Sequence, residues 1–140
     1  MNQPLLPVVP DLCAVGEQGE LELSGSFCAA CRRYAYPRVE HCPGCLQLTE
    51  RKPVGGRGRI YSYTVIRTRP PFQLPEPYAV GYIDLAASGL RVFGLFHPEA
   101  IEQLRIGMPV ALEEIPLGIN NDGQLCLRPV FSPAGTSDEH

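Results

Sequence analysis

The chain has 140 residues, with 12 basic and 15 acidic side chains, a formal net charge of −3 at pH 7 and 44% hydrophobic residues. This length suits one domain or two small modules, and the apolar content is enough for a modest buried core, which excludes a disordered chain. The acidic balance argues against a protein whose main ligand is nucleic acid.

Residues 1–20 are expected to form an N-terminal arm with little regular structure. The arm opens with MNQPLLPVVPDL, which has no basic n-region, and Pro4, Pro7 and Pro10 interrupt its short apolar run. This pattern fits neither a secretory signal peptide nor a membrane span. We therefore expect a cytoplasmic protein, in a compartment where cysteines stay reduced.

Residues 21–54 contain the stretch FCAACRRYAYPRVEHCPGCL, which holds four of the six cysteines as two C-x-x-C pairs separated by ten residues. In a reducing compartment this spacing predicts a zinc ribbon, in which four thiolates converge on one ion. Iron is the second choice, since CPGC also resembles half of a rubredoxin site, and a disulfide pair is the third. Short strands are expected near ELELSGS, RYAYP and LTERKPV. The predicted metal ligands are Cys28, Cys31, Cys42 and Cys45.

Such a metal site is expected to be structural. Cysteine fills all four coordination positions, so no position remains for a substrate or an activated water. Cys126 lies in the apolar run GQLCLRPVF and is expected to be a packed strand residue, and Cys13 lies in the arm. Neither has a histidine close in sequence that would activate it, and no catalytic residue is predicted.

The pattern changes to that of strands after the glycine-rich GGRG at residues 55–58. Five runs rich in β-branched and aromatic residues follow, and PEAIEQLRIG predicts a short helix with Pro98 in its first turn and Gly107 at its end. We therefore predict a mostly β protein: a rubredoxin-like zinc ribbon, a five-stranded OB-fold barrel with one short helix at residues 55–132, and a C-terminal tail at 133–140. The expected barrel strands are RIYSYTVIR, YAVGYIDL, LRVFGLF, MPVALEEI and QLCLRPVF.

This arrangement resembles a known family. A zinc ribbon followed by GRGRIYSYTVI, a proline-rich loop, LRIGMPVALE and a closing RPVFSPAG is similar to the OB-fold/zinc-ribbon family of acyl-CoA-associated proteins, once known only as a domain of unknown function. The resemblance covers roughly residues 20–135 and implies partnership with thiolases, thiolase-like synthases or aldolases and acyl-CoA hydratases. Members usually begin with helices before the ribbon, whereas this chain begins with its proline-rich arm.

Basic residues are concentrated in one part of the sequence. Residues 28–69 carry nine of the 12 basic side chains and only two acids, Glu40 and Glu50, which predicts an anionic ligand. Guanidinium groups of arginine and the backbone amides of VGGRGR could bind the phosphates of coenzyme A. The alternative ligand is single-stranded nucleic acid, which OB-folds often bind. The residues assigned to CoA binding are Arg57, Arg59, Tyr63, Arg67, Arg69 and Phe72.

The loop RTRPPFQLPEPY joins the first two barrel strands, a position that OB-folds commonly use for ligands. Its four prolines stiffen it, so Phe72 and Leu74 are predicted to project as contacts for a partner or as the wall of a pantetheine tunnel. The alternative is that both side chains fold back over the end of the barrel. In the preceding strand either of two alternating sets can face the core: Tyr61, Tyr63 and Val65, or Ile60, Ser62, Thr64 and Ile66.

Together these features predict a non-catalytic, zinc-binding subunit of a thiolase-type acyl-CoA-processing complex, which helps to close the acyl-CoA site and stabilises the hetero-oligomer. The catalytic subunit would carry the nucleophile and the acid/base residues. The expected cofactors are a structural Zn²⁺ and a CoA thioester shared with the partner. A single-stranded nucleic-acid-binding protein and a free-standing acyl-CoA-binding protein are the alternatives.

Overall fold

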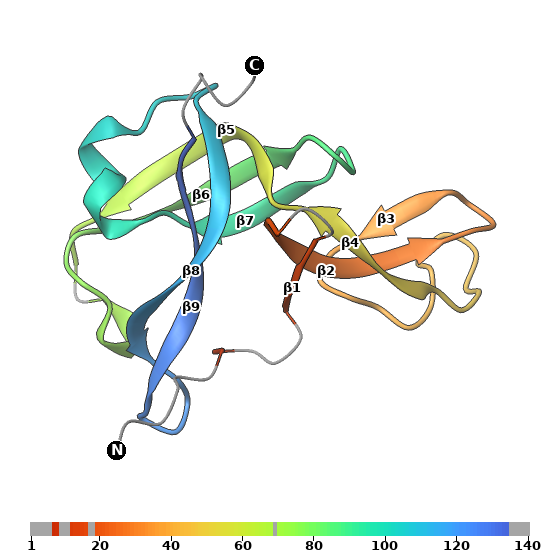
Figure 1. The fold of residues 1–140 in the computed structure, drawn as a ribbon, viewed down its shortest axis with the longest axis horizontal. Coiled ribbons are helices and arrows are strands. Elements are labelled where there is room, and N and C mark those ends of the chain that lie inside the picture. The colour runs from red at the N-terminus through yellow and green to blue at the C-terminus, as the bar shows by residue number, and fades with distance from the viewer. Residues whose placement is uncertain (1–6, 9–11, 17–18, 69, 135–140) are drawn as a thin grey trace.

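The computed structural model describes residues 7–8, 12–16, 19–68 and 70–134 of the chain. These residues form a four-stranded sheet and a five-stranded curled sheet, which lie next to each other (Figure 1). The predicted mostly β fold is confirmed. No helix among the described residues is long and apolar enough to cross a membrane.

The smaller sheet, called the ribbon below, is built around β2 (Leu21–Cys28). Strand β4 (Glu50–Gly55) pairs with one edge of β2, and β1 (Cys13–Val15) and β3 (Arg33–Ala35) pair with successive parts of the other edge. All pairs are antiparallel. Strand β1 is a short piece of regular structure within the predicted arm of residues 1–20, and its three residues are too few to give a period-two pattern that sequence could reveal.

The larger sheet, called the barrel below, has the strand order β7-β6-β5-β8-β9. Its two ends meet at a parallel bridge between Phe96 and Phe131, where the His97 N–H donates to the Phe131 carbonyl at 3.0 Å. This closure satisfies backbone groups that would otherwise lie on a free edge, and it confirms the predicted OB-like barrel. The strands are β5 (Arg57–Ile66), β6 (Tyr78–Leu85), β7 (Arg91–Leu95), β8 (Pro109–Ile119) and β9 (Leu125–Pro133).

A β-bulge in β5 explains why alternation did not reveal which face of this strand is buried. In the pairing with β6, Ile60 lies opposite Ile83 but Ser62 lies opposite Tyr82, so Tyr61 is the extra residue. Ile60 is 2% exposed, and Tyr63 packs against the same core from the other alternating set. The inward face therefore changes from one set to the other at Tyr61, as expected when one residue is inserted into a period-two pattern.

The predicted helix is a 3₁₀ helix, η2 (Pro98–Gln103), and ends earlier than expected. The His97 Nδ1 caps it by accepting the Glu99 N–H at 3.1 Å, with Pro98 in the first turn as predicted. Gly107 (φ +87°) lies in the turn after the helix rather than at its end. A second 3₁₀ turn, η1 (Pro71–Gln73), lies in the proline-rich loop.

The ribbon and the barrel share one hydrophobic core. Leu23 and Val54 from the ribbon belong to the same buried cluster as the barrel residues Ile83 and Phe131. The two sheets meet at Gly56, whose carbonyl accepts the N–H of Leu112 in β8 at 2.7 Å. The ribbon is thus anchored to the barrel at its base, and its opposite end extends away from the barrel (Figure 1).

Candidate functional site

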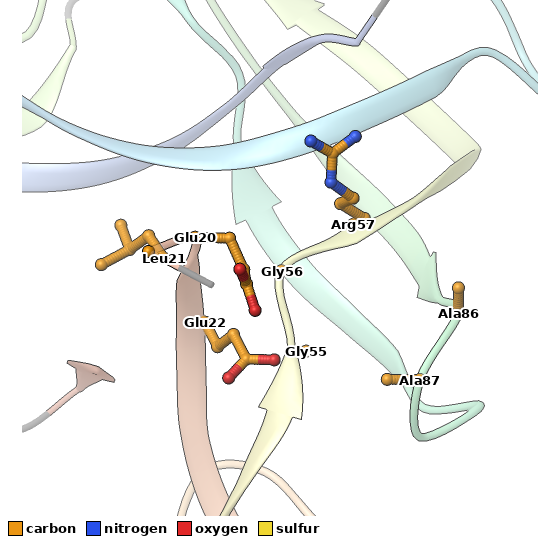
Figure 2. A pocket seen from close by; sticks show the side chains of 9 residues that line it. Glu20, Leu21, Glu22, Gly55, Gly56, Arg57, Ala86 and Ala87 are labelled. Carbon is orange, nitrogen blue, oxygen red and sulfur yellow. The ribbon is translucent and has the colours of Figure 1, made fainter. Parts of the chain in front are cut away.

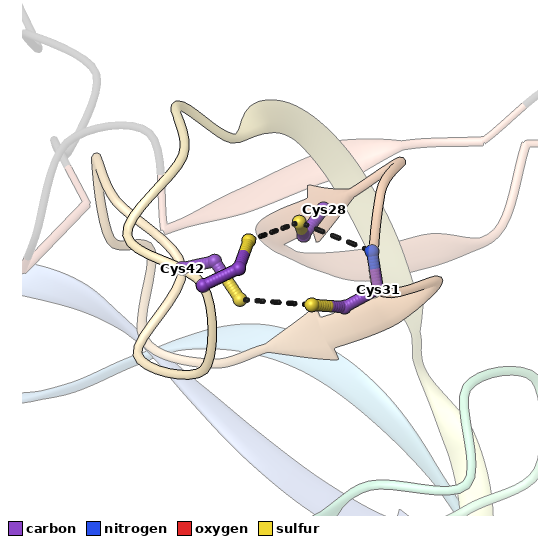
Figure 3. Close-up of side chains that lie close together, drawn as sticks. Cys28, Cys31 and Cys42 are labelled. Carbon is purple, nitrogen blue, oxygen red and sulfur yellow. Dashed lines mark hydrogen bonds between the residues drawn. The ribbon is translucent and has the colours of Figure 1, made fainter.

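The four predicted cysteine ligands come together at the end of the ribbon. The Cys31 and Cys42 Sγ atoms are 3.9 Å apart (Figure 3). The Cys28 and Cys45 Sγ atoms are 3.5 Å apart, and all four sulfurs lie within 4.8 Å of one another. Tetrahedral zinc with Zn–S bonds of about 2.3 Å places its sulfurs about 3.8 Å apart. The cluster therefore has the donor type, number and spacing that a zinc ion requires.

In each C-x-x-C turn a backbone N–H donates to the first cysteine's sulfur, and the residue after the second cysteine is left-handed. The Cys31 N–H donates to Cys28 Sγ at 3.4 Å, and the Gly44 N–H donates to Cys42 Sγ at 3.3 Å. The residue after each second cysteine has a left-handed backbone, with φ 56° at Arg32 and 66° at Leu46. This conformation normally favours glycine, so both turns keep a backbone geometry that their sequence does not favour.

The environment of the sulfurs favours bound cations. Amides of Cys45 and Gly44 stabilise the Cys42 thiolate and lower the pKa of Cys42 to about 7. Hydrogen bonds to Cys45 and Cys42 raise the pKa of Cys31 to about 12, so these crowded sulfurs share protons among themselves. A divalent cation bound between the sulfurs would replace those protons.

A buried hydroxyl fixes the loop between the two cysteine pairs. Ser26 in β2 is fully buried, and its Oγ donates to the Val39 carbonyl and accepts the Val39 N–H, both at 2.9 Å. The Thr49 hydroxyl also donates to the Val39 carbonyl, from the start of the strand that returns to the barrel. These bonds hold the second cysteine pair against the first, which suits a structural ion ligated only by the protein.

The predicted CoA-binding arginines do not line one cleft. Arg57 lines a cleft of about 690 Å³ between the ribbon and the barrel, together with Glu20 and Glu22, whose carboxylates lie near Gly55 and Gly56 (Figure 2). Arg67 lines a different cleft, of about 380 Å³, where three glutamates are its neighbours: Glu76, Glu99 and Glu102.

The other predicted CoA residues have varied surroundings. Arg59 donates to the Gly107 carbonyl at 2.9 Å, and Arg69 lies outside the described residues. Tyr63 is half-buried, donates its hydroxyl to the Leu104 carbonyl at 2.9 Å and packs edge-on against Phe96. Tyr63 therefore has a structural role in the barrel, whatever its part in ligand binding.

The proline-rich loop places its two apolar residues differently. Leu74 is 8% exposed, so it takes the folded-back position that the sequence left open as an alternative. Phe72 is 45% exposed and keeps a left-handed backbone, with the Arg128 guanidinium 5.4 Å from its ring centre. Arg128 is itself held by the carbonyls of Leu117 and Ile119 at 3.2 and 2.7 Å.

Phe72 lies beside an apolar groove that the sequence did not predict. The groove has a volume of about 460 Å³ and receives Val8 and Leu12 from the arm, Tyr36 from the ribbon and Phe93 from β7. The arm is held there by the Val8 N–H, which donates to the Leu127 carbonyl at 2.7 Å. Because these segments are far apart in sequence, no local pattern identifies the groove; the apolar character of the arm was its only signal.

The remaining two cysteines occupy packed positions. Cys126 is 1% exposed; its thiol points to the Leu117 and Gly118 carbonyls, and its sulfur accepts a hydrogen bond from the Arg128 guanidinium at 3.8 Å. Cys13 in β1 is half-buried, and the loss of solvent around it raises its pKa to about 11. Burial disfavours the thiolate of Cys13, and Cys126 is closed off from solvent, so neither thiol is placed as an accessible nucleophile.

Comparison with known proteins identifies the family. A model of the C-terminal OB-fold domain of ChsH2 matches residues 51–113. A DUF35 domain-containing scaffold protein from Methanocaldococcus jannaschii is 33% identical over 104 residues, which are 72% of this chain and 72% of that protein. The chain belongs to the DUF35 family. The family recognised from the sequence motifs is thus confirmed.

Two further DUF35 proteins are similar to this one. A DUF35 domain-containing scaffold protein from Methanothermobacter thermautotrophicus is 37% identical over 73 residues, or 50% of this chain and 54% of that protein. A chain of the solved Ltp2-ChsH2(DUF35) aldolase matches with a TM-score of 0.65 and 30% identity, covering 81% of this chain and 86% of that chain. The similarity to that chain therefore extends beyond the barrel to most of the described structure.

Proposed function

We propose that this DUF35 protein is a non-catalytic subunit of a thiolase-type complex that processes acyl-CoA. It binds the catalytic subunit, uses a structural zinc ion to keep the ribbon folded, and helps to close the acyl-CoA site. The observation that carries the proposal is the match, at 30% identity over 81% of this chain, to a chain of the Ltp2-ChsH2(DUF35) aldolase.

The chemistry of the cysteines supports a non-catalytic role. Cys28, Cys31, Cys42 and Cys45 are grouped so that the protein alone completes a tetrahedral site, which provides binding energy of about 10–16 kcal/mol in small zinc modules but no open position for chemistry. Cys126 is buried among the Leu117 and Gly118 carbonyls and the Arg128 guanidinium, and the pKa of Cys13 is raised by burial. The nucleophile of the complex is therefore assigned to the partner.

The CoA thioester is assigned to a site shared with the catalytic subunit. The predicted CoA residues Arg57 and Arg67 line separate clefts, each with glutamates among its lining residues. This chain would consequently supply only part of the contacts to the phosphates and the pantetheine, and the partner would supply the rest.

Reconstitution with a thiolase-type or aldolase-type catalytic subunit from the same organism tests the proposal. We expect a stable hetero-oligomer by size-exclusion chromatography with light scattering, no acyl-CoA turnover by this chain alone, and turnover by the mixture. Cys126→Ala should leave the turnover of the mixture nearly unchanged, because this thiol is buried and its polar contacts are all within the barrel, with the Leu117 and Gly118 carbonyls and the Arg128 guanidinium. Turnover by this chain alone, or loss of turnover in folded and assembled Cys126→Ala, would contradict the division of labour.

A further inference from the structure

The outer face of β5, β6 and β7 carries a row of exposed aromatic side chains. Tyr61, Tyr82 and Phe93 are 49%, 45% and 58% exposed, and their strands are adjacent in the barrel. Tyr82 and Phe93 are cross-strand partners, with ring centres 5.4 Å apart in an edge-on arrangement. Tyr61 is the bulged residue of β5, so the bulge turns it outward to join this row.

A charged row lies next to the aromatic one. Arg59, Asp84 and Arg91 are paired in register across the three strands. Arg91 donates to both carboxylate oxygens of Asp84, at 2.6 and 3.2 Å, and its guanidinium lies 3.4 Å from the centre of the Tyr61 ring. Arg59 contacts the Gly107 carbonyl, in a loop that also exposes Arg105 and Ile106.

These contacts restrict the side chains before anything binds. A stacked guanidinium and edge-on rings lose little rotamer entropy on association, and tyrosine, phenylalanine and arginine are the residues that most often anchor protein interfaces. The charged row has Arg59 and Arg91 against Asp84, and Arg105 is exposed in the adjoining loop, on a chain whose net charge is −3. Its charge therefore complements a surface that is acidic around an apolar centre.

We propose that the outer face of β5, β6 and β7 is the surface by which this chain docks on its catalytic subunit, at an apolar patch rimmed by carboxylates. Tyr82 and Phe93 are the apolar anchors, and Arg105, exposed in the adjoining loop, faces the carboxylates. This assignment rests on the proposed accessory function and names where that partner binds. The face is continuous with the apolar groove through Phe93, which belongs to both.

The same strands of OB-folds also bind single-stranded nucleic acid, but the charges here favour protein. The carboxylate of Asp84 lies in the middle of the face and is bound to Arg91, so a phosphate would have to displace it or lie beside a negative charge. Nucleic-acid grooves instead present unopposed cations along the path of the backbone.

The decisive experiment measures binding of the purified catalytic subunit by surface plasmon resonance. Tyr82→Ser with Phe93→Ser should weaken the complex roughly tenfold or more, mainly through faster dissociation. Arg105→Glu should slow association several-fold at low salt, with the difference disappearing as salt screens it. Leu125→Ser is the matched control, since Leu125 is 69% exposed at the start of β9, outside this face, and its loss should change neither rate.

The outcomes separate this inference from the function on which it rests. If the wild-type chain forms no complex with the catalytic subunit, the proposed function fails and this inference fails with it. If the complex forms but the Tyr82/Phe93 variant binds like wild type while remaining folded by circular dichroism, the docking face is wrong and the function stands. Tight binding of an oligothymidylate that weakens steeply with salt and is lost in the same variant would assign the face to nucleic acid instead.

Discussion

Replacing Gly56 with alanine tests whether the ribbon and the barrel form one rigid unit. A Cβ at Gly56 would lie 2.1 Å from the Leu21 carbonyl oxygen and 3.3 Å from the Leu112 Cβ. Carbon and carbonyl oxygen normally stay about 3.3 Å apart, so β2 would have to move away from β5 by about 1 Å. The obstacle is backbone, which cannot move aside by changing a rotamer.

This movement affects both bonds and packing at the junction. It strains the Leu112 N–H to Gly56 carbonyl bond of 2.7 Å and separates Leu23 from the barrel core that it shares. Overpacking costs about 1–3 kcal/mol and a weakened buried hydrogen bond about 1 kcal/mol, so we expect a loss of about 2–4 kcal/mol and a fall in Tm of roughly 10 °C.

The assay is thermal and urea unfolding of the zinc-loaded protein, followed by circular dichroism. Gly44→Ala is the matched control, because a Cβ there meets its nearest atoms, Arg33 Nη1 and Cys42 Sγ, at an ordinary 3.7 Å, and Cys31 Sγ at 3.9 Å. That change should alter stability by no more than about 0.5 kcal/mol, as is usual for surface substitutions. If Gly56→Ala unfolds at the same temperature as wild type, the ribbon moves freely at its base and the shared-core reasoning is refuted.

Three further predictions concern single side chains. Leu46→Gly should stabilise the zinc-loaded protein by about 0.5 kcal/mol in urea unfolding. Leu46 is 74% exposed, and the free energy cost of its left-handed backbone is larger than the entropy cost of ordering a glycine at this position. Destabilisation would contradict this. Tyr63→Phe should cost about 1 kcal/mol, because the Leu104 carbonyl loses its donor, and a normal stability with weakened CoA binding would instead favour a ligand role. Iodoacetamide should alkylate Cys13 at pH 9 roughly 50-fold more slowly in the folded protein than in urea, since a pKa of about 11 leaves about 1% thiolate at that pH. The alkylation rate of the folded protein should rise as the pH increases through 11. Equal rates in the folded and unfolded protein at pH 9 would contradict the burial argument.

Local chemistry made much of this fold predictable. The spacing of the cysteines sets where four thiolates can meet, and the structure brings all four together. The turn NNDGQ also follows from local chemistry, because the Asn120 side chain accepts the N–H groups of Asp122 and Gln124, and Gly123 has φ +79°. In both cases residues close in sequence decide the geometry.

Features that depend on distant contacts were not predictable. Strand β1 exists because its residues pair with β2, and the apolar groove needs the arm, the ribbon and β7 together. Leu74 illustrates the same limit, because a rigid loop can hold an apolar side chain outward or against the barrel with equal sequence support. Arg57 and Arg67 are close in sequence but line separate clefts, because residues along a twisted strand and the loop after it point in different directions.

The bulge at Tyr61 connects the fold to the docking face. Without the inserted residue, β5 would keep one alternation, and a register that buried Ile60 would turn Tyr63 and Val65 outward. With the bulge, Ile60 before the insertion and Tyr63 and Val65 after it all pack against the core. Tyr61 itself points outward, and the Arg91 guanidinium stacks on its ring. One extra residue thus completes the core and supplies an aromatic side chain to the outer face. The position is therefore constrained twice: deleting Tyr61 should unfold the barrel, whereas Tyr61→Ser should preserve the fold and weaken only partner binding.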